Sequence, residues 1–230
     1  MQIVIVAHAP ALDARPYAEM LRAANCRIAA DGGALPLLAA QILPEIVIGD
    51  LDSLDLASQA ALVARGVELR RFPREKDETD FELALLLAVD MGADVIDVLG
   101  ALGGRWDHTL ANVWLLAHPA LQGRRVRLLD GNQTLFLVRD QATIDGRHGD
   151  TISLIPLTPE VRGITTSGLR YPLENATLYA SAARGVSNVL LAPSANVAIT
   201  HGLLIVVKHD DDGAHQWNVA PTTEHESHNE

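Results

Sequence analysis

The sequence pattern changes near residue 130, and this change constrains the fold most strongly. Before it, short apolar runs alternate with longer stretches of helical periodicity. Strands separated by helices predict a mostly parallel sheet, whose ligands bind beyond the carboxyl ends of the strands. After Asp130 the helical periodicity disappears, and short β-rich runs separated by turn residues predict an antiparallel sandwich or barrel.

The expected elements follow from these two patterns. In the first half we expect strands at residues 3–7, 27–30, 46–48, 67–72 and 95–99. The helical patterns between them cover residues 15–24, 35–41, 81–91 and 109–118. In the second half we expect strands at residues 134–138, 151–157, 161–166, 188–191 and 197–207.

The chain is therefore expected to be an α/β protein with two domains and a tail. An N-terminal Rossmann-like domain with a parallel sheet covers residues 1–133, and a smaller all-β sandwich or barrel domain covers residues 134–208. From His209 onward there are six carboxylates and no Lys or Arg, which predicts a disordered acidic tail over residues 209–230. Weak metal binding by the tail histidines remains an alternative.

Composition and charge exclude several classes of protein. A net charge of −11 argues against a nucleic-acid surface, because such surfaces carry basic patches. No apolar run reaches the roughly 20 residues that span a bilayer, and MQIVIVAHAP lacks the basic residues and cleavage site of a signal peptide. We expect a cytoplasmic protein that binds neither nucleic acid nor membranes. The single cysteine, Cys26, argues against redox chemistry.

Two acidic motifs follow expected strands. In DGGA, Asp31 projects from a strand end, and the glycines, including Gly33, allow the backbone to approach a ligand. Taken alone, this motif is more simply explained as an ordinary Asp-Gly turn. In GDLDS, an extended chain would place Asp50 and Asp52 on the same side, a carboxylate pair that suits Mg²⁺. The alternative is a solvated loop or a helix cap.

The segment KDETDFE opens a helical pattern. Thr79 and Glu82 have the spacing of a capping box, which is a purely structural feature. Lys76 lies beside the expected helix N-terminus, where both its ammonium and the free N–H groups attract phosphate. Asp80 would complete a metal site with the two preceding aspartates. The alternative is that Lys76 only balances the neighbouring acids.

The segment GALGGRWDHTLAN leads from an expected strand into a helix. Its glycines, Gly103 and Gly104, suit a phosphate cradle, and Arg105 adds a bidentate donor. His108 and Asn112 are four residues apart and share a helix face, so they are candidates to flank one ligand. The alternative for His108 is a hydrogen bond at the helix start. No Walker A sequence occurs in the chain.

Taken together and in this order, these motifs resemble those of the thiamine pyrophosphokinases. The relevant segments are DGGA, GDLDS, KDETDFELAL and GGRWDHTLANVWLL, followed by TTSGLRYPLENATL, RGVSN and GLLIVV. The resemblance extends over about residues 1–208. It implies transfer of pyrophosphate from Mg-ATP to the hydroxyl of thiamine, with thiamine diphosphate and AMP as products.

The resemblance also implies roles for individual residues. Asp50, Asp52 and Asp80 would hold Mg²⁺ and the triphosphate, and either Asp80 or Asp107 would accept the hydroxyl proton. The ATP side would comprise Lys76, Thr79, Arg105 and Asp107 with the backbone of Gly103 and Gly104, and Asp31 would lie beside the metal ligands. Gly33, His108 and Asn112 are further ATP-side candidates from their own motifs. The thiamine side would come from the β-rich domain of a partner subunit, through Ser187, Asn188 and Ser167, which implies a homodimer.

Two positions depart from the family pattern. The family's first motif commonly continues DGGAN, whereas this chain has Leu35, and Ile205 stands where eukaryotic members place a tryptophan against thiamine. Two other functions remain open from the residues. One is a diphosphokinase for another hydroxymethyl heterocycle, such as a pterin. The other is a nucleotide sensor without an acceptor.

Overall fold

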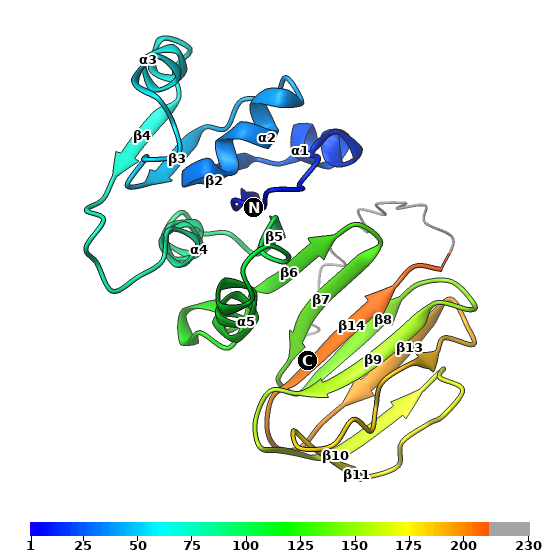
Figure 1. Ribbon diagram of the computed structural model, residues 1–230. Coiled ribbons are helices and arrows are strands. Elements are labelled where there is room, and N and C mark those ends of the chain that lie inside the picture. The colour runs from blue at the N-terminus through cyan, green and yellow to red at the C-terminus, as the bar shows by residue number, and fades with distance from the viewer. Residues whose placement is uncertain (212–230) are drawn as a thin grey trace, which may run out of the picture.

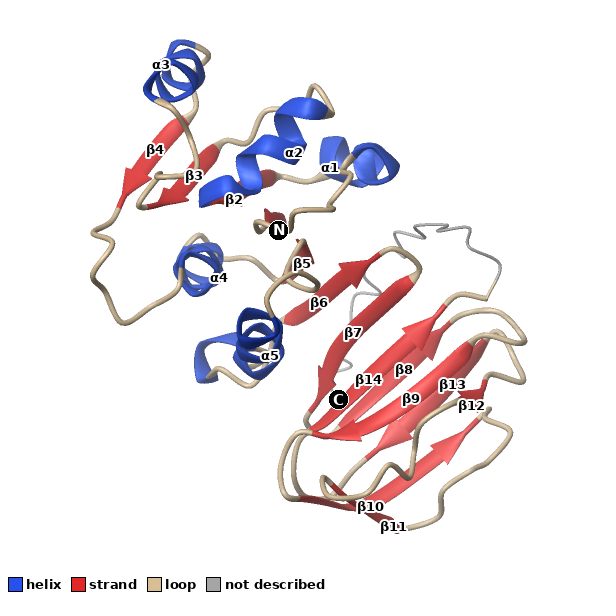
Figure 2. Cartoon of the chain, viewed as in Figure 1, coloured by secondary structure: helices blue, strands red, loops and turns tan. Residues whose placement is uncertain are grey.

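The computed structural model describes residues 1–211, whose strands form a 10-stranded and a 4-stranded sheet (Figures 1 and 2). In spatial order, the strands of the large sheet are β12 (Asn188–Val189), β9 (Thr151–Pro156), β14 (Leu204–His209), β7 (Gln133–Val138), β6 (Arg125–Asp130), β5 (Val95–Leu99), β1 (Gln2–Val6), β2 (Cys26–Ala30), β3 (Ile46–Gly49) and β4 (Glu68–Arg71). Those of the small sheet are β11 (Ala176–Tyr179), β10 (Glu160–Ser167), β13 (Ser194–Ala198) and β8 (Gln141–Asp145).

Strands β1 to β6 are parallel and carry helices on both faces. One face is covered by α1 (Ala18–Ala23), α2 (Ala34–Ala39) and α3 (Leu56–Ala64), and the other by α4 (Asp80–Asp90) and α5 (Trp106–Leu115) (Figure 1). Short 3₁₀ turns are η1 (Arg15–Tyr17), η2 (Asp31–Gly33) and η3 (Pro119–Leu121). Because both faces are covered, the central strands are almost entirely apolar, as IVIV in β1 shows.

The β-rich half is a sandwich that shares the large sheet. Strand β7 is antiparallel to β6, and β14 lies between β7 and β9. Buried residues of this part of the large sheet, such as Ile152 and Leu204, pack against Ile144, Ile164 and Val197 of the small sheet. The predicted class, a parallel α/β part followed by a β sandwich, is therefore confirmed. The large sheet continues through residues 133 and 134, where the sequence places the domain boundary.

Several elements differ from those expected. The run expected as one strand over residues 197–207 forms β13 and β14, separated by a turn in which Gly202 has φ +94°. Helix α5 begins at Trp106 rather than near residue 109. Strands β6, β8 and β11 and helix α3 were not predicted.

The predicted acidic tail lies almost wholly outside the described residues, because description ends at Asp211. His209 itself is the last residue of β14, and its Nε2 lies 2.9 Å from the side-chain nitrogen of Asn132. Within residues 1–211 we find no helix with the length and apolarity needed to cross a bilayer.

Candidate active site

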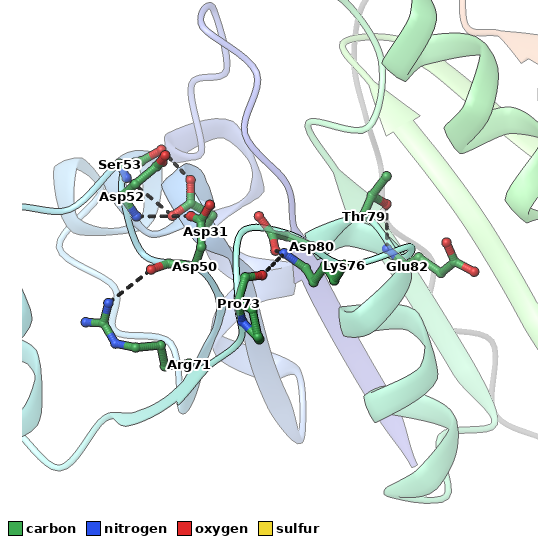
Figure 3. Close-up of polar contacts among 10 residues, drawn as sticks. All are labelled: Asp31, Asp50, Asp52, Ser53, Arg71, Pro73, Lys76, Thr79, Asp80 and Glu82. Atoms are coloured by element: carbon green, nitrogen blue, oxygen red, sulfur yellow. Dashed lines mark hydrogen bonds and ion pairs between the residues drawn. The ribbon is translucent and has the colours of Figure 1, made fainter.

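Three aspartates gather where two neighbouring parallel strands end (Figure 3). Asp31 follows β2, and Asp50 and Asp52 follow β3. Each offers a carboxylate oxygen, and the three oxygens lie within 4.8 Å of one another. Adjacent parallel strands end at the same edge of a sheet, which is the usual ligand site of such a fold. The arrangement provides a set of hard oxygen donors at this edge.

The backbone of this cluster is turned rather than extended. Leu51, between the two acids of GDLDS, has φ +63°, and Asp31 has φ +42°. The extended conformation expected for residues 50–52 is therefore wrong, and the turn brings the two carboxylates together instead. Asp50 Oδ1 accepts a hydrogen bond from the N–H of Asp52 at 3.1 Å, and the hydroxyl of Ser53 donates to Asp31. Non-glycine residues with positive φ are strained and recur at functional sites.

Gly49 lets Asp80 approach the cluster from the start of α4. A Cβ at position 49 would lie 2.9 Å from Cγ of Asp80 and 3.1 Å from Cβ of Asp31. The φ of Gly49, +146°, also lies in a region that other residues rarely adopt. The glycine between strand and acidic loop is thus required both for its conformation and for the space it leaves.

The carboxylate of Asp80 has an ion-pair partner but lacks a hydrogen bond at one of its oxygens. Its Oδ1 forms an ion pair with Nζ of Lys76 at 2.9 Å, while Lys76 also donates to the carbonyl of Pro73 at 3.1 Å. Among the described residues, no donor meets this buried Oδ1 with hydrogen-bond geometry. Burial raises the pKa of Asp80, Lys76 opposes that shift, and repulsion from Asp31 and Asp50 adds to it.

Thr79 is the N-cap of α4, and its hydroxyl accepts a hydrogen bond from the N–H of Glu82 at 3.1 Å (Figure 3). The predicted capping role of Thr79 is therefore confirmed. The cap fixes the first turn of α4 next to Asp80. The acid is thereby held on a defined helix start rather than on a loose loop.

A cavity of about 310 Å³ opens beside these acids. Residues after the end of β1 and from the end of β2, the acidic loop, α4, the glycine-rich loop and α5 line it: Ala7, His8, Pro10, Ala30, Asp31, Ser53, Thr79, Asp80, Phe81, Gly100, Ala101, Gly103, Gly104, Arg105, His108 and Asn112. The cavity is therefore lined both by acidic residues and by a glycine-rich loop that carries an arginine. Most of the ATP-side residues predicted from sequence meet here.

The glycine-rich loop is held by the helix that follows it. Gly103 and Gly104 have φ of +83° and +73°. The buried amide of Asn112 donates to the carbonyl of Ala101 at 2.8 Å, and the hydroxyl of Thr109 donates to that of Gly103 at 3.3 Å. Asn112 thus fixes the loop in addition to lining the cavity.

Asp107 differs from Asp80 in its surroundings. It is exposed, forms an ion pair with Arg105 and accepts a hydrogen bond from the N–H of His108 at 3.0 Å. Hydrogen bonding to Arg105 lowers the pKa of Asp107 to about 2. Asp107 does not line the cavity, whereas Arg105 does.

Other predicted site residues lie outside the cavity. A Cβ at Gly33 would lie 1.9 Å from the carbonyl oxygen of Val6, so that glycine is required for packing against β1. Ser167, Ser187 and Asn188 belong to the β-rich half and do not line the cavity. The amide of Asn188 accepts from the N–H of Tyr171 at 3.0 Å and donates to its carbonyl at 2.8 Å, within its own chain.

Sequence reasoning missed three residues near the site. His8 lines the cavity just beyond the end of β1, and the rule that ligands bind beyond strand ends would have found it. Gln59 and Arg71 contact the backbone of the acidic loop from α3 and from the end of β4. No local pattern predicts those contacts. Ile205, at the position where the resemblance places the tryptophan of the eukaryotic members, is 2% exposed.

Comparisons with known proteins match both halves of the chain. The family model "Thiamin pyrophosphokinase, catalytic domain" matches residues 17–128, and "Thiamin pyrophosphokinase, vitamin B1 binding domain" matches residues 140–204. The thiamine pyrophosphokinase of Bacillus subtilis (strain 168) is 30% identical over 186 residues, which are 80% of this chain and 87% of that protein.

Solved structures agree with these matches. The thiamine pyrophosphokinase structure from Bacillus subtilis has a TM-score of 0.82 at 27% identity and covers 92% of this chain and 100% of its own. The structure from Geobacillus thermodenitrificans has a TM-score of 0.78 at 29% identity, covering 92% of this chain and 98% of its own.

Proposed function

The chain belongs to the thiamine pyrophosphokinase family, and from that premise we propose that the cavity beside Asp80 is where it transfers pyrophosphate from ATP to thiamine. The products of this reaction are thiamine diphosphate and AMP. The observation that carries the proposal is the position of the acidic cluster directly beside a cavity with a glycine-rich loop and Arg105. Acids that hold a cation and donors that hold phosphates are the two requirements of phosphoryl-type transfer.

We assign Mg²⁺ to the acidic cluster. The oxygens of Asp31, Asp50 and Asp52 lie close enough together to share one ion, and carboxylate oxygens are the donors that Mg²⁺ prefers. Asp80 faces the same place across Gly49. When bound, the ion neutralises charge on the phosphates. The sequence interpretation assigned the ion to Asp50, Asp52 and Asp80; we propose instead that Asp31, Asp50 and Asp52 hold it, with Asp80 beside them paired to Lys76.

The phosphates would lie along the glycine-rich side of the cavity. The backbone of Gly103 and Gly104 can approach an oxyanion closely, because neither residue carries a side chain. Arg105 offers paired N–H donors on the same side, and Lys76 adds a positive charge beside Asp80. These groups hold the triphosphate in line, which is most of what the protein contributes to this kind of reaction.

Asp80 is better suited than Asp107 to accept the proton of the thiamine hydroxyl. A general base must combine contact with the reacting group and a pKa that is not too low. Asp80 lines the cavity, and burial raises its pKa. Asp107 lies outside the cavity with a pKa of about 2, which makes it a weak base. We therefore assign Asp107 to holding Arg105.

The thiamine side is proposed to come from a second subunit. Ser167, Ser187 and Asn188 fall within the segment that matches the vitamin B1 binding model, residues 140–204, yet they do not line the cavity of their own chain. A homodimer in which the β-rich half of one subunit meets the cavity of the other would complete the site. Closed two-fold dimers are the commonest assembly of soluble proteins.

The decisive experiment identifies the products formed from ATP and thiamine. Thiamine diphosphate together with AMP is the expected result. Formation of ADP, or AMP release that does not depend on thiamine, would refute the assignment. A hydroxymethyl pterin tested in parallel distinguishes the rival diphosphokinase, and ATP binding without turnover on either acceptor would indicate a sensor.

A further inference from the structure

We propose that Gln59 and Arg71 are positioning residues that hold the acidic loop, residues 50–54, in the conformation that binds a divalent cation. This inference rests on the proposed metal site. Neither side chain is placed among the metal ligands. Both donate hydrogen bonds to backbone carbonyls of the loop and leave its carboxylates available to a cation.

Both ends of the Gln59 side-chain amide are hydrogen-bonded, the nitrogen to the acidic loop and the oxygen to Arg71. Its Nε2 donates to the carbonyl of Leu51 at 3.1 Å and to that of Leu54 at 2.7 Å. Its Oε1 accepts a hydrogen bond from Nη2 of Arg71 at 2.6 Å. Gln59 is 8% exposed, so these bonds lie away from water and are costly to lose.

Arg71 extends the same network to the first acid. Its Nη1 donates to the backbone carbonyl of Asp50 at 3.1 Å (Figure 3), while its Nη2 donates to Oε1 of Gln59. The planar guanidinium therefore joins the α3 side chain to the loop with two N–H groups in a fixed geometry. Together the two residues engage three carbonyls of one short loop.

The loop requires such support because its backbone is strained and its side chains repel one another. Leu51 has φ +63°, a conformation that a leucine adopts only when the surroundings impose it. The carboxylates of Asp50 and Asp52 lie within 4.8 Å of each other and of Asp31. Without bonds to its carbonyls, the loop would relax toward an extended conformation, in which the carboxylates separate.

Removing Arg71 tests the proposal, because its charge and its positioning role predict opposite changes in cation affinity. A positive charge beside an acidic cluster competes with a bound cation, so its removal should strengthen cation binding by Coulomb attraction alone. If Arg71 instead acts by holding the carbonyl of Asp50, its removal should weaken binding. Groups that orient metal ligands typically contribute about 10–100-fold to affinity.

The experiment measures binding of Mn²⁺ with α,β-methylene ATP by electron paramagnetic resonance, so that no turnover is required. The variants are Gln59→Leu and Arg71→Met. We expect each to weaken Mn²⁺ binding by about tenfold or more. Arg71 is exposed, so Arg71→Met keeps a folded protein available if Gln59→Leu does not fold.

Two matched controls separate positioning from general effects. Leu62→Ala removes a 2% exposed side chain of the same helix, α3, that shares an apolar cluster with Leu51 and Leu54 of the loop, so it tests packing support without the hydrogen bonds. Arg70→Met removes a positive charge from the adjacent residue, whose guanidinium bonds Glu68 instead. Both controls should stay within about twofold of the parent affinity, although Leu62→Ala should lower the melting temperature.

The outcomes are distinct. Arg71→Met that binds Mn²⁺ as tightly as the parent, or more tightly, overturns the positioning role. So does Leu62→Ala that weakens binding as much as Gln59→Leu. Asp52→Asn serves as the reference for the metal site: if it leaves Mn²⁺ binding unchanged, the proposed metal site fails and the positioning role with it. If it weakens binding while Gln59→Leu does not, only the positioning role fails.

Discussion

Gly49→Ala tests whether the acidic cluster depends on the space that a glycine leaves. The added Cβ would lie 2.9 Å from Cγ of Asp80 and 3.1 Å from Cβ of Asp31. Carbon atoms in contact normally stay about 3.5–4.0 Å apart, so both acids must move by roughly 0.5 Å. A backbone φ of +146° is also unfavourable for alanine.

The expected loss of stability follows from these two terms. A residue forced into a sparsely populated backbone region costs about 1–3 kcal/mol, and overpacking typically costs a further ~1–3 kcal/mol. Together they lower the free energy of unfolding by about 2–6 kcal/mol, which corresponds to a fall in melting temperature on the order of 10 °C for a chain of this size.

Gly66→Ala is the matched control. Gly66 has φ +84°, and a Cβ there would meet nothing within 4 Å. It therefore carries the backbone term alone, about 1–2 kcal/mol. Both variants are compared by thermal denaturation and by turnover at a temperature well below both transitions.

Activity should separate the two glycines. A displacement of reacting groups by about 1 Å can reduce a rate 100-fold, so Gly49→Ala should lose at least tenfold in kcat. Gly66→Ala should stay within about twofold, because it lies between α3 and β4, away from the acids. If the two variants have equal turnover below their melting temperatures, the packing of Asp80 against the cluster is not needed for catalysis.

Three further substitutions test the remaining assignments. Asp52→Asn should leave the melting temperature without metal unchanged or slightly higher, because it removes repulsion between like charges. Mg-ATP binding and turnover should fall sharply, and normal turnover would contradict the metal site. Asp107→Asn should not move the acid limb of the pH profile of kcat, because Asp107, with a pKa of about 2, stays ionised over that range. The limb should instead follow protonation of Asp80, whose pKa is raised above 3.8. A limb that moves with Asp107→Asn would reverse that assignment. Mixing chains that carry Asp52→Asn with chains that carry Asn188→Ala should restore about a quarter of the parental sites by subunit exchange, and no recovery of activity would argue against a shared site.

The sequence predicted the α/β half well because each signal there is local. Strands buried on both faces appear as short apolar runs, and the cap of α4 appears as Thr79 three residues before Glu82. The acids could be placed near one another because parallel strands β2 and β3 end at the same edge. These conclusions needed no knowledge of tertiary contacts.

Other features depend on contacts between distant segments. The turn at Leu51 contradicts the extended chain expected there, and its φ depends on carbonyl bonds from Gln59, which comes from a helix that the sequence did not predict. Helix α3 exposes Leu56 and Val63, so its apolar residues do not fall on one face with helical periodicity. The break between β13 and β14 was missed because the apolar runs at residues 197–199 and 203–207 are separated only by Thr200, His201 and Gly202.

The position of β14 in the large sheet has a consequence for how the chain acquires its structure during synthesis. This strand ends at His209 and fills the gap between β7 and β9, which precede it by many residues. Strands β1 to β6 can pair with one another as soon as residue 130 has left the ribosome, because only β6 has a later partner, β7, which follows it directly. The neighbouring edges of β7 and β9 must wait for residues 204–209, with their backbone groups unpaired. Nascent chains stalled before residue 204 should therefore be the species that chaperones bind and that aggregate.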